Sequence, residues 1–184
     1  MGDDAGYSAS ELARRLKPGK RADRPFQTPG DVFEFWFSDS ATNPVTLARK
    51  HKIWFGGGAA IDRLIARRGL DLIAKLASGE AWLWANKGPA ERLAAIIALD
   101  QFTRNVFRDT PAMFENDAQA LELCKTGLAL GEDKALSPLK RWFFYMPLEH
   151  SESLDDQERC VDLFEDLAEA ADRGPCCQSS WELR

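Results

Sequence analysis

A hydroxyl or amide side chain stands directly before a proline at four places in this chain. The four pairs are Thr28-Pro29, Asn43-Pro44, Thr110-Pro111 and Ser137-Pro138. Such a side chain caps a helix by accepting from a free backbone N–H, and proline suits the first helical position because the missing N–H has no partner there. From Ala59 onward, apolar residues recur about every 3.6 residues. The sequence therefore predicts an all-α protein of antiparallel helix pairs joined by short turns.

The length and composition favour one globular domain. The chain has 184 residues, of which 45% are hydrophobic and 29% are charged. We expect a helical domain over residues 28–173, after a mobile basic arm over 1–27 and before an irregular, truncated tail over 174–184. Within the arm, Ser8 and Glu11 are expected to form a capping box. The paired helices predict an array similar to tetratricopeptide repeats, although only a faint echo of a period of about 34 residues is visible.

Charge and hydropathy exclude several classes of protein. The net charge of −5 argues against general nucleic-acid binding, which needs clustered Lys and Arg. No apolar run of about 18 residues is present, so we expect no membrane span. The N-terminus lacks the apolar stretch of a signal peptide. None of the four cysteines forms a C-x-x-C pair, which favours a reduced, cytoplasmic protein.

The sequence predicts neither a metal nor a cofactor. The only histidines are His51 and His150, so a three-histidine zinc site is excluded. Mg²⁺ or Mn²⁺ on Glu149, Glu152 and Asp155 is chemically allowed, but the signal is unspecific. No phosphate-loop, dinucleotide-binding or nucleophile-elbow motif is present.

One segment mixes core-type and polar residues, namely Leu99-Asp-Gln-Phe-Thr-Arg-Asn-Val-Phe-Arg108. If residues 90–108 form one helix, Asp100 and Arg104 lie one turn apart and should pair. Arg104 and Arg108 would lie one turn apart as well, and like charges at that spacing repel. Either the helix ends near Thr103, or an anion or carboxylates from the acidic 149–158 segment lie between the two arginines.

A second polar segment is Pro147-Leu-Glu-His-Ser-Glu152. Proline clashes with the preceding helical turn, so Pro147 is predicted to end its helix and to leave Glu149, His150 and Glu152 on a connector. A histidine beside carboxylates can transfer protons near neutral pH. It can equally cap a helix or pair with a carboxylate. Because the charges are complementary, we expect the segments 99–108 and 147–157 to meet.

Several motifs, in this order, resemble a bacterial family catalogued as domain of unknown function 924, whose members are described as tetratricopeptide-repeat-like. They are Asp31-Val-Phe-Glu-Phe-Trp-Phe37, Trp54-Phe55-Gly56, the two polar segments, Phe114, Asp117 and Asp156-Gln157. The resemblance runs from about residue 30 to 168. Thr103 replaces a usual proline, Glu149 replaces a usual methionine, and the chain departs from the family after Arg173. The resemblance implies a helical fold and no particular reaction.

Three functions stay open at this point. The first is a binding module that holds a peptide, a protein or a small anionic ligand in a polar groove between the segments 99–108 and 147–157. The second is an enzyme that uses His150 with Asp100 or Glu152 as acid and base. The third is a structural protein whose ion pairs only join helices; the oligomeric state is left open. The expected ligand-binding residues are Trp54, Asp100, Gln101, Arg104, Asn105, Arg108, His150, Glu152 and Gln157.

Overall fold

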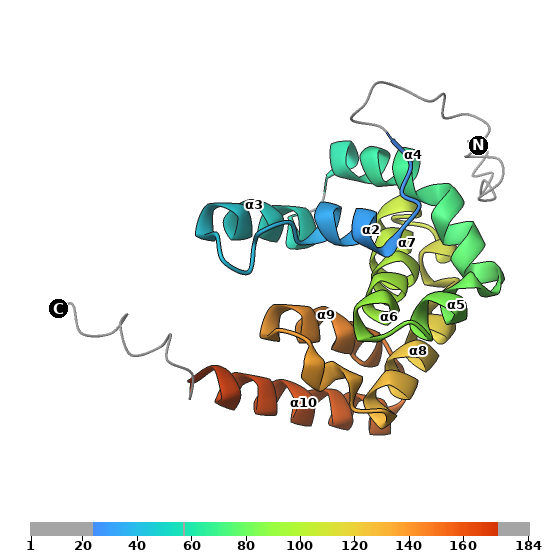
Figure 1. The fold of residues 1–184 in the computed structure, drawn as a ribbon. Coiled ribbons are helices and arrows are strands. Elements are labelled where there is room, and N and C mark those ends of the chain that lie inside the picture. Colours follow the sequence, from blue (N-terminus) through green and yellow to red (C-terminus); the bar gives the residue numbers. More distant parts are fainter. Residues whose placement is uncertain (1–23, 57, 173–184) are drawn as a thin grey trace.

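The computed structural model describes residues 24–56 and 58–172, and these fold into helices only (Figure 1). The predicted all-α class is confirmed, since no strand occurs in these ranges. The α-helices are α2 (Pro29–Trp36), α3 (Pro44–Phe55), α4 (Ala59–Lys75), α5 (Ala81–Ala85), α6 (Pro89–Ile96), α7 (Thr103–Val106), α8 (Asp117–Ala129), α9 (Pro138–Glu149) and α10 (Leu154–Asp172). Two π-helical turns (Leu76–Glu80 and Ile97–Phe102) and two 3₁₀ turns (Pro111–Phe114 and Glu132–Ala135) complete the order.

The predicted helix starts at Thr28 and Asn43 are confirmed. Thr28 Oγ1 accepts from the backbone N–H of Asp31, and Asp31 Oδ2 accepts in return from the N–H of Thr28. Asn43 Oδ1 accepts from the N–H of Val45. These side chains satisfy backbone donors that a helix leaves free at its first turn. These two helix starts therefore follow from local chemistry, whereas Ser137 precedes α9 as predicted but its side chain makes no capping hydrogen bond.

The start predicted at Thr110 is only partly right. Thr110 precedes the 3₁₀ turn Pro111–Phe114, and the α-helix α8 begins later, at Asp117. The Thr110 hydroxyl caps no helix, because it donates to the carbonyl of Phe107 at 2.7 Å. The side chain thus closes the preceding turn instead of opening a helix.

Part of the predicted N-terminal arm belongs to the core. Phe26 is 2% exposed, and its backbone N–H donates to the carbonyl of Arg68. Its ring packs 5.2 Å from the ring of Phe102. The packed core therefore includes a residue that precedes Thr28. The capping box expected at Ser8 and Glu11, the rest of the arm and the tail over 174–184 lie outside the described residues.

A central helical run carries the core of the molecule. It consists of α6, the π turn Ile97–Phe102 and α7, and every residue from Arg92 to Thr103 is buried. Helices α2, α5, α8 and α9 pack around α6. Consecutive helices also pair, α5 with α6 and α9 with α10 (Figure 1). Within the described ranges, no helix combines the length and apolar character that crossing a bilayer requires.

The assumption of one straight helix over 90–108 is wrong. Residues 97–102 form a π turn, α7 ends at Val106, and Phe107 has left the helical region with φ −112° and ψ 25°. A π turn adds a residue to the helical cycle, so it changes the direction of the side chains that follow. The repulsion expected between Arg104 and Arg108 is therefore avoided, because Arg108 lies beyond the helix.

The predicted helix end at Pro147 is also wrong. Pro147 lies inside α9, which continues to Glu149 with His150 as its C-cap residue. The proline costs α9 only the backbone bond that its missing N–H would make to the carbonyl of Phe143, and the helix continues for two residues beyond it. Gln157 of α10 then satisfies the end of α9, since its Nε2 lies 2.7 Å from the carbonyl oxygen of Glu149.

Candidate functional site

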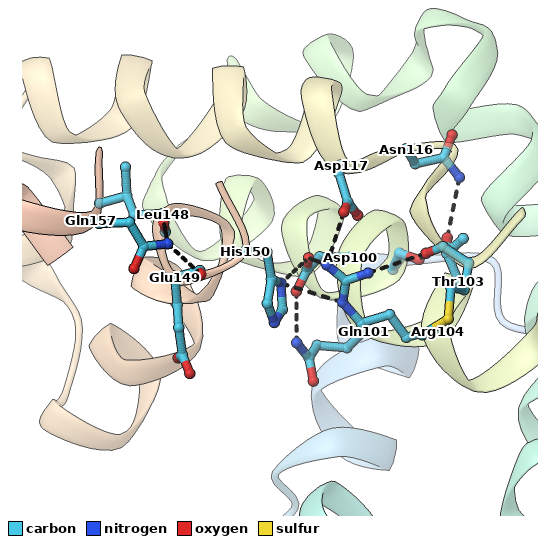
Figure 2. Close-up of polar contacts among 12 residues, drawn as sticks. Asp100, Gln101, Thr103, Arg104, Asn116, Asp117, Leu148, Glu149, His150 and Gln157 are labelled. Atoms are coloured by element: carbon cyan, nitrogen blue, oxygen red, sulfur yellow. Dashed lines mark hydrogen bonds and ion pairs between the residues drawn. The ribbon is translucent and has the colours of Figure 1, made fainter. Parts of the chain in front are cut away.

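The buried carboxylate of Asp100 is the centre of the polar cluster. Its side chain is 1% exposed and receives nitrogen donors from three residues (Figure 2). His150 Nδ1 lies 2.7 Å from Oδ1, Gln101 Nε2 donates to Oδ2 at 2.6 Å, and Arg104 Nη2 lies 3.5 Å from Oδ1. A buried carboxylate is costly unless it is paired and hydrogen-bonded, and Asp100 meets both conditions.

The contacts of His150 favour one tautomer. Nδ1 lies 2.7 Å from Asp100 Oδ1 and 3.3 Å from Arg104 Nε, and the arginine nitrogen can only donate. A single ring nitrogen cannot donate to Asp100 and accept from Arg104 at once. The shorter contact and the guanidinium beside Asp100 favour an ionised carboxylate that accepts from Nδ1–H. Nε2 then carries the lone pair, and it has no hydrogen-bond partner within the described ranges.

The guanidinium of Arg104 joins three elements. Its Nη2 donates to Asp117 Oδ2 of α8 at 2.9 Å, and its Nη1 donates to the carbonyl of Met113 at 3.2 Å. The predicted pairing with Asp100 is confirmed at 3.5 Å. Phe114 lies across the guanidinium, with 5.3 Å between the ring centroid and Cζ. The side chain of Arg104 is 16% exposed, so its donors are directed inward to protein groups.

Asp117 is held in an unfavourable place for a charge. Burial raises the pKa of Asp117, the charge of Asp100 raises it further, and the hydrogen bond from Arg104 offsets only part of this. Its Oδ1 atom is buried without a hydrogen-bond partner in the described structure. One oxygen of this carboxylate therefore does all the pairing with Arg104.

The two polar segments meet, as the sequence predicts, through the contact between Asp100 and His150. The carboxylates that pair with the arginines are, however, not from the 149–158 segment. Arg104 pairs with Asp117, and Arg108 pairs with Asp62 of α4. The prediction chose the segment with the most acidic residues. The fold instead packs α8 and α4 against the central run, so Asp117 and Asp62 are the carboxylates that the two arginines reach.

A second polar cluster lies around Asp62. Asn105 Nδ2 donates to Asp62 Oδ1 at 2.9 Å, and Arg108 Nε donates to Oδ2 at 2.8 Å. Burial acts to raise the pKa of Asp62, but the hydrogen bonds from Arg108 and Asn105 outweigh it and hold that pKa below its usual value. Asn105 and Arg108 are thus separated from the Asp100 cluster and tie α4 to the end of α7.

Three further expected site residues make no recorded contact with Asp100 or His150. Trp54 donates from Nε1 to the carbonyl of Trp36 and packs in the aromatic core. Gln157 caps α9 through backbone carbonyls. Glu152 is exposed on the loop after His150. The structure therefore brings together Asp100, Gln101, Arg104 and His150.

Sequence reasoning missed two members of this region as site residues. Asp117 pairs with Arg104, and Asn116 Nδ2 donates to the buried hydroxyl of Thr103 at 3.1 Å. Asp117 is one of the residues that carry the family resemblance, and no other feature of the sequence marks it as part of a site. Across residues 24–56 and 58–172, no group of three His, Cys, Asp or Glu could hold a metal ion.

The fold and the cluster define a class: an all-α protein with a buried carboxylate where α8, α9 and the central run meet (Figure 2). The chain belongs to the family described as "Bacterial protein of unknown function (DUF924)", whose model matches residues 32–180. The match extends past Arg173, where the sequence had suggested a departure from the family. No curated protein matches the chain.

A solved structure with the same fold supports this assignment. It is entitled "Structure of Protein of Unknown Function ATU0120 from Agrobacterium tumefaciens". Its chain is 30% identical to this one, with a TM-score of 0.63. The alignment covers 78% of this chain and 80% of that chain. The similarity therefore extends over most of both molecules.

Proposed function

We propose that this protein is an enzyme in which His150 transfers a proton at Nε2 and Asp100 is the positioning residue. The observation that carries the proposal is the 2.7 Å contact between Nδ1 of His150 and Oδ1 of Asp100, with Nε2 left without a protein partner in the described ranges. A carboxylate on one ring nitrogen of a histidine fixes the tautomer and leaves the other nitrogen as a base.

The chemistry follows from these two side chains. Nε2 takes a proton from a substrate or from a water molecule, and the imidazolium that forms is stabilised by the adjacent carboxylate of Asp100. The His150 side chain is 21% exposed, so a ligand can reach the ring, whereas Asp100 is shielded from water. Both recorded contacts of the ring involve Nδ1, so the group that meets Nε2 must come from outside the described chain.

Binding of a peptide or a small anion between the two segments has weaker support. An anion would need free donors, but Arg104 is engaged by Asp117 and Asp100, and Arg108 is engaged by Asp62. The same pairing supports a second candidate, a purely structural network that joins α4, α7, α8 and α9. The enzyme and the structural network differ in what they require of Nε2. Proton transfer needs a free lone pair on this atom, whereas a structural network does not.

Nitrogen-15 NMR distinguishes these candidates, because the chain has only two histidines. A His51→Gln variant leaves one imidazole, and His51 is exposed, so this change should not disturb the fold. In the neutral imidazole of His150 we expect the proton on Nδ1 and the lone pair on Nε2. In Asp100→Asn this preference should be lost. A proton on Nε2 in the wild type would overturn the proposal.

A turnover screen supplies the second arm of the test. Wild type and His150→Gln are incubated with a panel of small amines, amides and esters, and product is followed by mass spectrometry. We expect a reaction in the wild type that His150→Gln lacks while it still unfolds cooperatively. Equal turnover in both proteins would exclude His150 as the proton-transferring group. If His150→Gln only lowers the melting temperature and no substrate reacts, the structural candidate is supported.

Two finer expectations stay proposals. Adjacent packing of α5 with α6 and of α9 with α10 supports an array similar to tetratricopeptide repeats. The buried, free thiols of Cys124 and Cys160 support a reduced, cytoplasmic setting. Quantifying free thiols in protein isolated under alkylating conditions tests the second of these.

A further inference from the structure

The carboxylate of Asp100 accepts hydrogen bonds from two neighbouring side chains. The Nδ1–H of His150 is directed at Oδ1, and the Nε2–H of Gln101 is directed at Oδ2. A carboxylate only accepts, so the amide nitrogen of Gln101 must face it and the amide oxygen must face away. One buried carboxylate thus decides which atoms both side chains present on their other side.

The atoms on that other side are both acceptors. His150 presents the lone pair of Nε2, and Gln101 presents Oε1. Neither atom has a hydrogen-bond partner in the part of the chain that the structure describes. Figure 2 shows the two atoms on the same side of the cluster, pointing away from Asp100. The Gln101 residue as a whole is 9% exposed, while Oε1 is not one of the buried atoms left without a partner, so this oxygen is open to a group that arrives from solvent.

The charges of the cluster point in the same direction. Its charged side chains are the carboxylates of Asp100 and Asp117 and the guanidinium of Arg104, which leaves an excess of negative charge when His150 is neutral. The exposed carboxylates of Glu149 and Glu152 flank His150 in the sequence. An arriving anion would be repelled, whereas a cation would be attracted.

We infer that the site takes a cationic nitrogen group with at least two N–H donors, a primary ammonium or a guanidinium, held between Nε2 of His150 and Oε1 of Gln101. The inference rests on the proposed function, since it names the substrate class for the same histidine. One N–H donates to Nε2, which is the atom that takes the proton, and another donates to Oε1. Gln101 is then the residue that selects the substrate.

The test uses methylguanidinium and methylammonium as probes of the intact chain. Proton NMR follows the ring signals of His150, and the ring of His51 is the internal control. We expect saturable shifts of the His150 signals and none of the His51 signals. Tetramethylammonium has the same charge and no N–H donor, so it should not shift them. Acetate and phosphate, which carry the opposite charge, should leave them unchanged.

A pair of variants tests the role of Gln101. Gln101→Met keeps the size of the side chain and removes the acceptor, and it should weaken methylguanidinium binding about tenfold. Gln119→Met is the matched control. Gln119 is also partly buried, and its side-chain amide donates to the backbone carbonyl of Leu76. This control should bind as the wild type does. Cooperative unfolding of both variants would show that they are folded. The comparison of cations with tetramethylammonium, acetate and phosphate uses the wild type alone, so it does not depend on the variants.

Each outcome bears on a different statement. Equal binding of tetramethylammonium, or shifts caused by acetate or phosphate, would overturn the inference about substrate class. Absence of any cation effect would overturn it as well. If His150 nevertheless carries its proton on Nδ1, the proposed function stands while the substrate class fails. A proton on Nε2 would overturn both statements together.

Discussion

His150 Nδ1 and Asp100 Oδ1 lie 2.7 Å apart, although fifty positions separate the two residues in the chain. This contact connects the end of α9 to the π turn of the central run. It fixes the ring of a partly exposed histidine against a carboxylate that water cannot reach. The orientation of His150 is therefore set by the core of the protein and does not depend on the surface.

The first prediction concerns Asp100→Asn. The amide has the same size but presents N–H donors to the nitrogen donors of its neighbours, so at least one buried donor loses its partner. We expect a loss of about 1–3 kcal/mol in the free energy of unfolding. Urea unfolding measures this change. Asp71→Asn, at an exposed position, is the control and should change stability by less than about 0.5 kcal/mol.

The second prediction compares two arginines. Arg104→Ala leaves two carboxylates, Asp100 and Asp117, without their shared counterion and should cost about 3–5 kcal/mol. Arg108→Ala removes a pair with Asp62 in which the arginine is 42% exposed, and it should cost less than about 1 kcal/mol. Thermal and urea unfolding of both variants give the comparison. Equal losses would show that burial of the Asp100 cluster contributes nothing to its strength.

The third prediction is a loss of stability in acid that depends on Asp156. Burial acts to raise the pKa of Asp156, but the hydrogen bonds from Lys125 and Ser151 outweigh it and lower the pKa below its usual value. The folded state thus favours the ionised form. Its contribution is complete above the pKa of the unfolded chain and is lost as the pH falls through the folded pKa. Unfolding free energies of wild type and Asp156→Asn should therefore converge below about pH 4.

The fourth prediction has the opposite sign and concerns Asp117. Because burial raises the pKa of Asp117 in the folded state, its contribution is present at low pH and is lost as the pH rises through that raised pKa. The stability of Asp117→Asn relative to wild type should consequently increase between pH 3 and about pH 6. Urea titrations across this range measure the difference. A relative stability that falls over the same range would contradict the assigned direction.

The fifth prediction concerns Gly127 of α8, which side chains from α6 and α9 approach closely. A Cβ atom on Gly127 would lie 2.5 Å from Cζ of Phe144 and 2.6 Å from Cδ of Arg92. Both neighbours are buried, so Gly127→Ala should destabilise the protein by about 1–3 kcal/mol. Gly69→Ala is the matched control, since its nearest atoms would lie at 3.4 Å and alanine favours a helix. Urea unfolding should show a clear loss in the free energy of unfolding for Gly127→Ala, and little change or a small gain for Gly69→Ala.

The sequence predicted those features that depend on neighbouring residues. The cap at Thr28 and the pairing of Asp100 with Arg104 each involve residues within four positions, so local rules apply. The mixture of core-type and polar residues singled out the segments around Asp100 and His150, and their complementary charges predicted that they meet. The all-α class followed from the same local signals.

The remaining features depend on distant contacts or on the exact helical cycle. Arg108 and Asp62 pair because α4 packs against α7, which no spacing in the sequence reveals. The π turn at 97–102 is invisible to a wheel drawn at a fixed angle per residue. The orientation of Gln101 follows from the position of a carboxylate oxygen, and that position is known only once the turn is folded.

The π turn also makes the central run sensitive to its length. Its extra residue is what allows Asp100, Gln101 and Arg104 to converge on one buried point before the helix resumes. Deleting one residue between Ile97 and Phe102 would leave a regular α-helix of better hydrogen-bond geometry. A π turn holds one more residue in about the same rotation than a regular helix does, so the residues after the turn would keep about the same direction, while those within it would shift relative to α8 and α9. The number of residues in this turn is therefore part of what builds the cluster, and a deletion here would separate the donors from Asp100 even though the surrounding helices stayed in place.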